Sequence, residues 1–192
     1  MIPLYDAHNH LQDERLSPAL EAICAELPAL GVQRCVVNGA CEKDWPHVEA
    51  LAKIFPWITP AFGLHPWFAK ERSATWFDTL RSFLDANPGA CIGEIGLDRW
   101  IQDYDIAVQE KVFTAQLQLA AERNLAASIH CLKAWGHLND VLQTNPRPPR
   151  GFLLHSYGGS AEMFPTFVKL GAYFSISGYF AHERKAAQRE VF

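Results

Sequence analysis

The chain has 192 residues, a formal net charge of −4 and a hydrophobic fraction of 49%. This length and composition fit one globular domain, and they exclude an intrinsically disordered chain, a collagen-like chain and a small disulfide scaffold. We expect no membrane span and no signal peptide, because no apolar run is long enough and the first residues lack a basic region. The slight acidity gives no general attraction to nucleic acid, but a local metal site could supply the positive charge that a nuclease needs.

The cysteines are scattered along the chain. They number five and none forms a C-x-x-C pair, which argues against a zinc ribbon and against a disulfide framework. We therefore expect reduced thiols in a cytoplasmic protein, with no membrane association and no obligate protein partner.

Strand-like and helix-like segments alternate along the sequence. Apolar runs of strand length lie near residues 4, 34, 58, 90, 126, 151 and 172. The spacing of apolar residues predicts helices over 44–55, 75–86, 106–124, 134–143 and 160–170, with another beginning at 182. A first helix is expected to begin with Ser17 as its N-cap and Pro18 in its first turn.

The segment 106–124 has the clearest helical pattern. An apolar stripe runs through Val112 and Leu117, and Gln109 and Gln116 belong to the more polar positions around it. Repeated strand-then-helix units of about 25–35 residues predict an α/β fold with a parallel sheet. Seven strands suit an open doubly wound sheet, whereas a (β/α)8 barrel has eight strands and usually about 250 residues.

The first strand carries a cluster of polar residues. Asp6, His8 and His10 are spaced by two, so a strand would place all three on one face. Two imidazoles placed in this way can bind one metal ion, with the aspartate orienting one of them. The same spacing also fits the solvated face of an edge strand.

Further candidate ligands follow other strands. Glu94 lies among glycines and apolar residues, where a carboxylate is costly to bury unless it is paired or bound to a metal. His65, His130 and His155 each come at the end of an apolar run. Any one of them fits a structural role, but together they converge on the strand ends where parallel α/β enzymes place their sites. Nitrogen and carboxylate donors indicate a transition-metal hydrolase and suit zinc, manganese or nickel.

These motifs resemble the TatD family of metal-dependent hydrolases and deoxyribonucleases, in the amidohydrolase-like barrel superfamily. The resemblance spans almost the whole chain, with its elements in the family's order. The matching segments are D-A-H-N-H at 6–10, G-L-H-P-W at 63–67, G-E-I-G-L-D at 93–98, I-H-C at 129–131, L-L-H-S at 153–156 and Y-F-S-I-S-G at 173–178.

The resemblance implies a TIM-type (β/α)8 barrel with two divalent metal ions: zinc, manganese, nickel or magnesium. His8 and His10 would bind one ion, His130 and His155 the other, and Glu94 would bridge both and serve as the catalytic carboxylate. An activated water would then attack a phosphodiester in DNA or in a small phosphate ester.

Other residues receive supporting roles by the same resemblance. His65, Asp98 and Lys133 would contact the substrate, and Asp6 would lie behind the metal ligands. Lys133 also fits a solvated lysine at the start of a helix. Trp67, Trp100 and Trp135 fit packing or lid positions better than base stacking.

The sequence departs from the family in one respect. Family members continue to an eighth strand that ends in a metal-binding aspartate, whereas this sequence stops at residue 192, inside the expected seventh helix. Residues 1–192 are therefore expected to form a single, C-terminally incomplete barrel. Two alternatives to a phosphodiesterase stay open: cleavage of an amide, lactone or C–N bond, and a truncated, catalytically impaired form.

Overall fold

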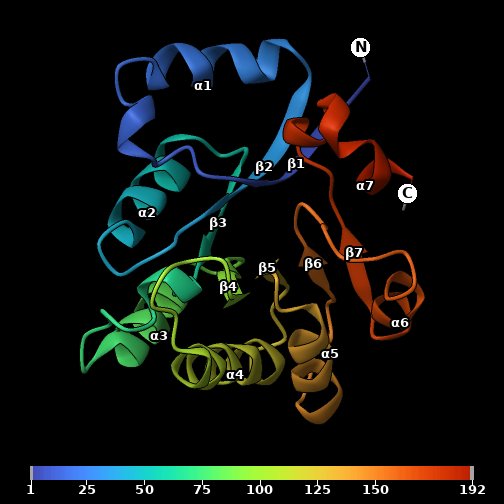
Figure 1. Ribbon diagram of the computed structural model, residues 1–192. Coiled ribbons are helices and arrows are strands. Elements are labelled where there is room, and N and C mark those ends of the chain that lie inside the picture. Colours follow the sequence, from blue (N-terminus) through green and yellow to red (C-terminus); the bar gives the residue numbers. More distant parts are fainter. Residues whose placement is uncertain (1, 191–192) are drawn as a thin grey trace.

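The computed structural model describes residues 2–190 as one parallel sheet with helices between its strands (Figure 1). Each strand pairs in parallel with its neighbours along the chain, in the order β1 to β7. The strands are β1 (Leu4–Asn9), β2 (Val32–Asn38), β3 (Ile58–Phe62), β4 (Cys91–Asp98), β5 (Ala127–Leu132), β6 (Phe152–Leu154) and β7 (Ala172–Phe174).

The described chain also contains seven α-helices and four short 3-10 helices, of which η3, η4 and α7 follow the last strand. The α-helices are α1 (Leu20–Ala29), α2 (Trp45–Ile54), α3 (Trp76–Ala86), α4 (Ile106–Glu122), α5 (Trp135–Thr144), α6 (Phe164–Lys169) and α7 (Ala186–Arg189). The 3-10 helices are η1 (Glu14–Leu16), η2 (Pro66–Phe68), η3 (Gly178–Ala181) and η4 (Glu183–Lys185). Within residues 2–190, every helix is too short or too polar to cross a bilayer.

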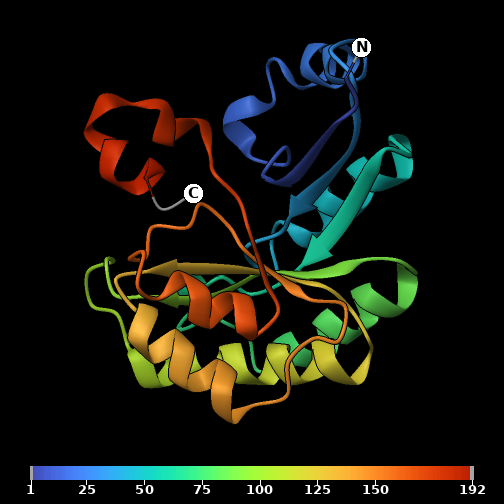
Figure 2. The same ribbon diagram turned by 90° about the vertical axis from the view of Figure 1, so that its right-hand side faces the viewer.

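The sheet curls into part of a barrel. Figures 1 and 2 show the connecting helices around the outside of the strands. This sequential strand order distinguishes the fold from an open doubly wound sheet, in which the order reverses and helices cover both faces. The predicted α/β fold of TIM type is therefore confirmed.

The core lies between the sheet and its helices. Strands supply fully buried side chains such as Val37, Phe62 and Ile95, and α4 supplies Phe113 and Leu117. Strands of parallel sheets are apolar in long runs because helices pack against them. This explains why the apolar runs located the strands correctly.

Two glutamines of α4 differ from expectation. Gln109 and Gln116 are 2% and 0% exposed, although the helical pattern placed them among the more polar positions. Gln116 accepts a hydrogen bond from the Leu64 N–H at 2.7 Å and donates to the Leu64 carbonyl at 3.2 Å. Gln109 bonds both backbone groups of Asp98 in the same way, at 2.8 and 2.9 Å. These glutamines join α4 to the ends of two strands.

Some helix boundaries also differ. Ser17 ends the 3-10 helix η1 instead of capping α1, which begins at Leu20 after Ala19. The helix expected over 160–170 is shorter in the structure. It is limited to α6, with Met163 as its N-cap. The helix expected from 182 consists of η4 followed by α7, and residues 191–192 lie outside the described part.

Candidate metal centre

The carboxylate of Glu94 lies at the centre of the candidate site. It belongs to the middle of β4, and the residue is 3% exposed. Oε2 of Glu94 lies 3.5 Å from Nε2 of His8 and 3.0 Å from Nε2 of His10. Oε1 lies 3.2 Å from Nδ1 of His130 and 2.6 Å from Nε2 of His155. The two oxygens therefore face two different pairs of imidazoles.

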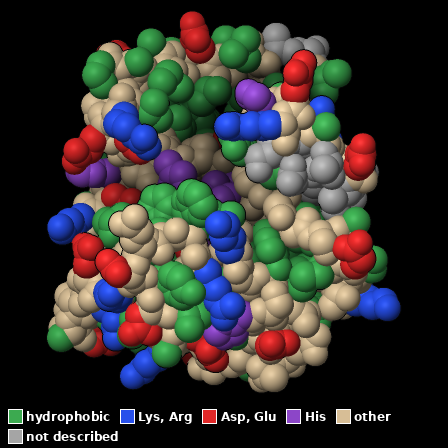
Figure 3. All heavy atoms as spheres, in the orientation of Figure 1, with side chains coloured by type: hydrophobic (Ala, Val, Ile, Leu, Met, Phe, Trp, Pro, Cys, Tyr) green, Lys and Arg blue, Asp and Glu red, His purple; other side chains and the backbone are tan. Residues whose placement is uncertain are grey.

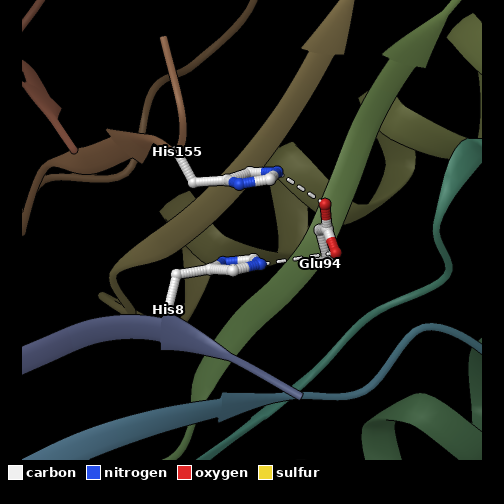
Figure 4. A group of neighbouring side chains, drawn as sticks. All are labelled: His8, Glu94 and His155. Carbon is white, nitrogen blue, oxygen red and sulfur yellow. Dashed lines mark ion pairs between the residues drawn. The ribbon is translucent and has the colours of Figure 1, made fainter. Parts of the chain in front are cut away.

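The strands bring these side chains together from distant parts of the chain. Figure 4 shows His8 on β1, His155 just after β6, and both rings pointing to Glu94 on β4. The rings of His8 and His155 are stacked, with centroids 3.9 Å apart and planes inclined by 2°. Residues 147 positions apart in sequence thus meet only because the sheet curls.

Close contact between strands depends on glycines beside Glu94. Gly96 has a φ of 144°, and a Cβ on it would overlap the carbonyl oxygen of His130 on β5. A Cβ on Gly93 would lie 2.6 Å from Oδ1 of Asn38, the last residue of β2. The glycines therefore allow β4 to approach its neighbours at the site.

His65 is a fifth imidazole beside the carboxylate. It precedes η2, its Nε2 lies 3.4 Å from Oε1 of Glu94, and it is 5% exposed. Its Nδ1 accepts a hydrogen bond from the N–H of Trp67 at 3.2 Å, which fixes the ring. The structure thus places His65 within the same cluster as the four expected metal ligands.

The rings of the first strand are oriented by groups that the sequence did not single out. Nδ1 of His8 lies 2.7 Å from Oγ of Ser128, and Nδ1 of His10 donates to the carbonyl of Asn38 at 2.7 Å. Asp6 was expected to orient a histidine ring, but its Oδ1 accepts the backbone N–H of His8 and its Oδ2 the side-chain amide of Asn9. Ser128 lies two residues before His130 on β5, so an S-x-H pattern on a strand could have revealed it.

Asp98 does not line the substrate cavity as expected. It is 0% exposed, and its Oδ2 accepts hydrogen bonds from Nε2 of His130 at 2.9 Å and Nε1 of Trp67 at 2.7 Å. Its Oδ1 accepts the Trp100 backbone N–H at 2.6 Å. Protein donors thus occupy both oxygens, and Asp98 holds the His130 ring.

The remaining candidates lie further from Glu94. Lys133 is exposed before α5, and its Nζ lies 4.2 Å from the ring centre of Trp100. Trp135 packs against Tyr157 and Phe167 in ring contacts, which agrees with a packing role.

Burial and charge determine the protonation of the cluster. Burial lowers the pKa of His8 to about 4, so this ring is neutral at pH 7. Burial would raise the pKa of Glu94, but the surrounding imidazoles hold it well below its usual value. Burial would likewise lower the pKa of His130, but hydrogen bonds to Asp98 and Glu94 raise it to about 9. A buried carboxylate requires nearby positive charge, which protons on the imidazoles or metal cations bound to them can supply.

The spacing of the donor atoms fits metal ions. An ion bound to two imidazole nitrogens at about 2.0–2.1 Å with tetrahedral geometry separates them by roughly 3.3 Å. Nε2 of His8 and Nε2 of His10 are 3.2 Å apart, and Nδ1 of His130 and Nε2 of His155 are 3.3 Å apart. Ligand atoms of His8, Glu94 and His155 also lie within 4.8 Å of one another, as do those of His65, Glu94 and His130. The residues present therefore suit one or more transition-metal ions.

The cluster opens into a cavity of about 630 Å³, called here the metal cavity. Glu94, His10, His65 and His130 lie at its inner end, and Trp67 is among the residues at its walls. Figure 3 shows histidine side chains in a hollow on this face, with charged side chains of both signs around it. A cavity of this size admits a small ligand or part of a polymer.

Comparison with known proteins shows the family to which the chain belongs. The metal-dependent hydrolase YjjV of Escherichia coli, itself uncharacterised, is 27% identical over 188 residues, which cover 97% of this chain and 72% of that protein. A crystal structure of YjjV, described as a TatD homologue, superposes with a TM-score of 0.91 and covers 98% of this chain and 73% of the other. A protein of Pantoea named 3'-5' ssDNA/RNA exonuclease TatD is 30% identical over 192 residues, covering 96% of this chain and 72% of the relative. The family described as TatD related DNase matches residues 5–192, and the chain therefore belongs to this family.

Proposed function

We propose that the chain is a metal-dependent phosphodiesterase that hydrolyses single-stranded nucleic acid with two divalent metal ions. One observation carries the proposal: the two oxygens of Glu94 face separate pairs of histidines. We assign one ion to His8 and His10 and the other to His130 and His155, with Glu94 bridging them. Imidazole donors favour zinc, manganese or nickel over magnesium at both positions.

The spacing of the nitrogen atoms within each histidine pair supports the assignment of one pair to each oxygen of Glu94. Both pairs have the separation expected of two imidazoles on one ion. When bound, divalent ions at this site would lower the pKa of a water molecule and polarise a phosphoryl oxygen. The carboxylate of Glu94, which is buried away from solvent, would hold the two ions close together.

The protein's own groups position the substrate and exclude water. His65 lies at the inner end of the metal cavity, and burial lowers its pKa, so its ring is neutral at pH 7. We assign Nε2 of His65 to a hydrogen bond with a phosphoryl oxygen of the substrate. Trp67 is 49% exposed at the wall of the same cavity, so it limits the space beside the reacting phosphate.

The substrate class follows from the relatives. One relative is named an exonuclease of single-stranded DNA and RNA, and the matching family is described as a DNase. An open cavity about 630 Å³ in volume suits the end of a flexible strand better than an intact duplex. We therefore expect activity on single strands and on small phosphodiesters.

The test combines metal analysis with a choice of substrates. The purified chain is loaded with zinc, manganese or nickel, and bound metal is counted by elemental analysis. Cleavage of single-stranded DNA and RNA is then compared with turnover of amides and lactones. We expect nucleic-acid cleavage that a chelator abolishes, and less bound metal and no cleavage for Glu94→Gln. Amide or lactone turnover without nucleic-acid cleavage would contradict the proposal.

A further inference from the structure

Three cavities that share lining residues lead away from Glu94. The metal cavity and a second cavity of about 310 Å³ share Cys41, Lys43 and Phe68. The second cavity and a third of about 550 Å³ share Arg72 and Ser73. The three cavities are therefore neighbours on the surface, and the side chains that they share lie between them.

The third cavity, called here the basic cavity, is positively charged. Lys70 and Arg72 contribute from the segment between η2 and α3, and Lys111 from α4. None of its lining residues in the described part of the chain is acidic. This concentration of cations contrasts with the net charge of −4 for the chain as a whole.

Two cations of the basic cavity, Lys70 and Arg72, contact uncharged backbone oxygens. Nζ of Lys70 donates to the backbone carbonyl of Asp103 at 2.8 Å, and the guanidinium of Arg72 donates to the carbonyl of Ala69. Carbonyl oxygens carry no net charge, and a lysine has three donors and an arginine five, so further donors are available. A set of cations with spare donors is suited to a phosphate group.

An aromatic side chain completes the basic cavity. Trp76, the first residue of α3, is half-buried and lines it next to the cations. Channels for single-stranded nucleic acid combine cations that contact the backbone with aromatic rings on which bases stack.

We propose that the basic cavity binds a backbone phosphate of a nucleic-acid strand whose scissile phosphate lies at Glu94. This inference rests on the proposed function and adds a second contact, at a distance along the strand from the reaction. Strands long enough to reach the basic cavity would bind more tightly than a dinucleotide. The second cavity, which contains both cations and acids, would be crossed by the strand between these two contacts.

Binding without hydrolysis tests this inference. A fluorescent strand of about ten nucleotides and a labelled dinucleotide are titrated with the protein in a chelator, and anisotropy gives each Kd at several salt concentrations. Lys111→Gln removes one cation from an exposed helix position with little change in helix propensity. Lys169→Gln, at an exposed position of α6, is the matched control.

We expect Lys111→Gln to weaken binding of the longer strand by about two- to fivefold. The slope of log K against log salt should decrease in magnitude by about 0.7, the value for one phosphate contact on a single strand. Dinucleotide binding and the Lys169→Gln control should not change. If the wild-type protein binds the longer strand and Lys111→Gln alters neither Kd nor slope, the basic cavity is not a phosphate site, although the proposed function stands. If the wild-type protein neither binds nor cleaves single strands, both proposals are wrong.

Discussion

Asp98 accepts a hydrogen bond from Nε2 of His130 at 2.9 Å, while Nδ1 of the same ring lies 3.2 Å from Glu94. A carboxylate that holds the far nitrogen of a metal-binding histidine fixes the ring and its tautomer. We therefore predict that Asp98→Asn weakens metal binding about 10- to 100-fold, the usual effect of losing such a partner. Competition with a fluorescent chelator measures the change.

Trp67→Phe is the control for this prediction. Trp67 donates its Nε1–H to the same oxygen of Asp98 at 2.7 Å, so the variant disturbs Asp98 but leaves the carboxylate beside His130. We expect a smaller loss of metal affinity for Trp67→Phe than for Asp98→Asn. Equal metal affinity for Asp98→Asn and the wild type would show that Asp98 does not act through His130.

Ser128 is predicted to position His8. Its Oγ lies 2.7 Å from Nδ1 of His8, and the serine is 4% exposed. Ser128→Ala should lower the affinity for metal by about tenfold because the ring loses the hydroxyl that orients its Nδ1. Ser82→Ala removes an exposed hydroxyl on α3 that bonds the Asp78 carbonyl, and it should leave metal affinity unchanged. A loss of thermal stability in Ser128→Ala with normal metal affinity would assign Ser128 a structural role instead.

The sequence predicted the elements better than it predicted the contacts between them. Strand positions were predictable because buried strands of a parallel sheet are apolar in runs, as in Cys91–Asp98. The positions of His8 and His130 on strands were predictable from spacing and from the family resemblance. The spacing of Ser128 and His130 could have placed Ser128 on the same face of its strand. The partners of Ser128 and Asp98 could not be predicted, because each depends on which atoms meet across strands β1, β4 and β5 after the sheet curls.

The glutamines of α4 show a second limit of sequence patterns. Helical periodicity separates apolar from polar residues, and it does not distinguish a solvated glutamine from one that bonds a buried backbone. Gln116 is completely buried because the N–H and carbonyl of Leu64 need a partner where β3 has ended. The need for this partner arises in the loop that leads to His65, so the sequence of the helix alone does not reveal it.

Gln116→Leu is therefore predicted to destabilise the fold. The change keeps the side-chain volume similar but leaves the N–H and carbonyl of Leu64 buried without their partner. Such losses cost about 1–3 kcal/mol for each group, so we expect the free energy of unfolding to fall by about 2–6 kcal/mol. Urea denaturation measures it, with the exposed Gln118→Leu as the control. Equal stability of Gln116→Leu and wild type would contradict the prediction.

The buried thiol of Cys35 should make stability depend on alkaline pH. Cys35 is 1% exposed, and burial raises its pKa from 9.0 to about 11, a shift only partly offset by a hydrogen bond with Asn9. Above pH 9.0 the unfolded thiol loses its proton while the folded thiol keeps it, so the unfolded state is favoured. The free energy of unfolding should therefore fall as the pH rises from 9.0 to about 11. Urea denaturation across this range should show a shallower fall for Cys35→Ala, and parallel curves for the two proteins would mean that Cys35 ionises normally in the fold.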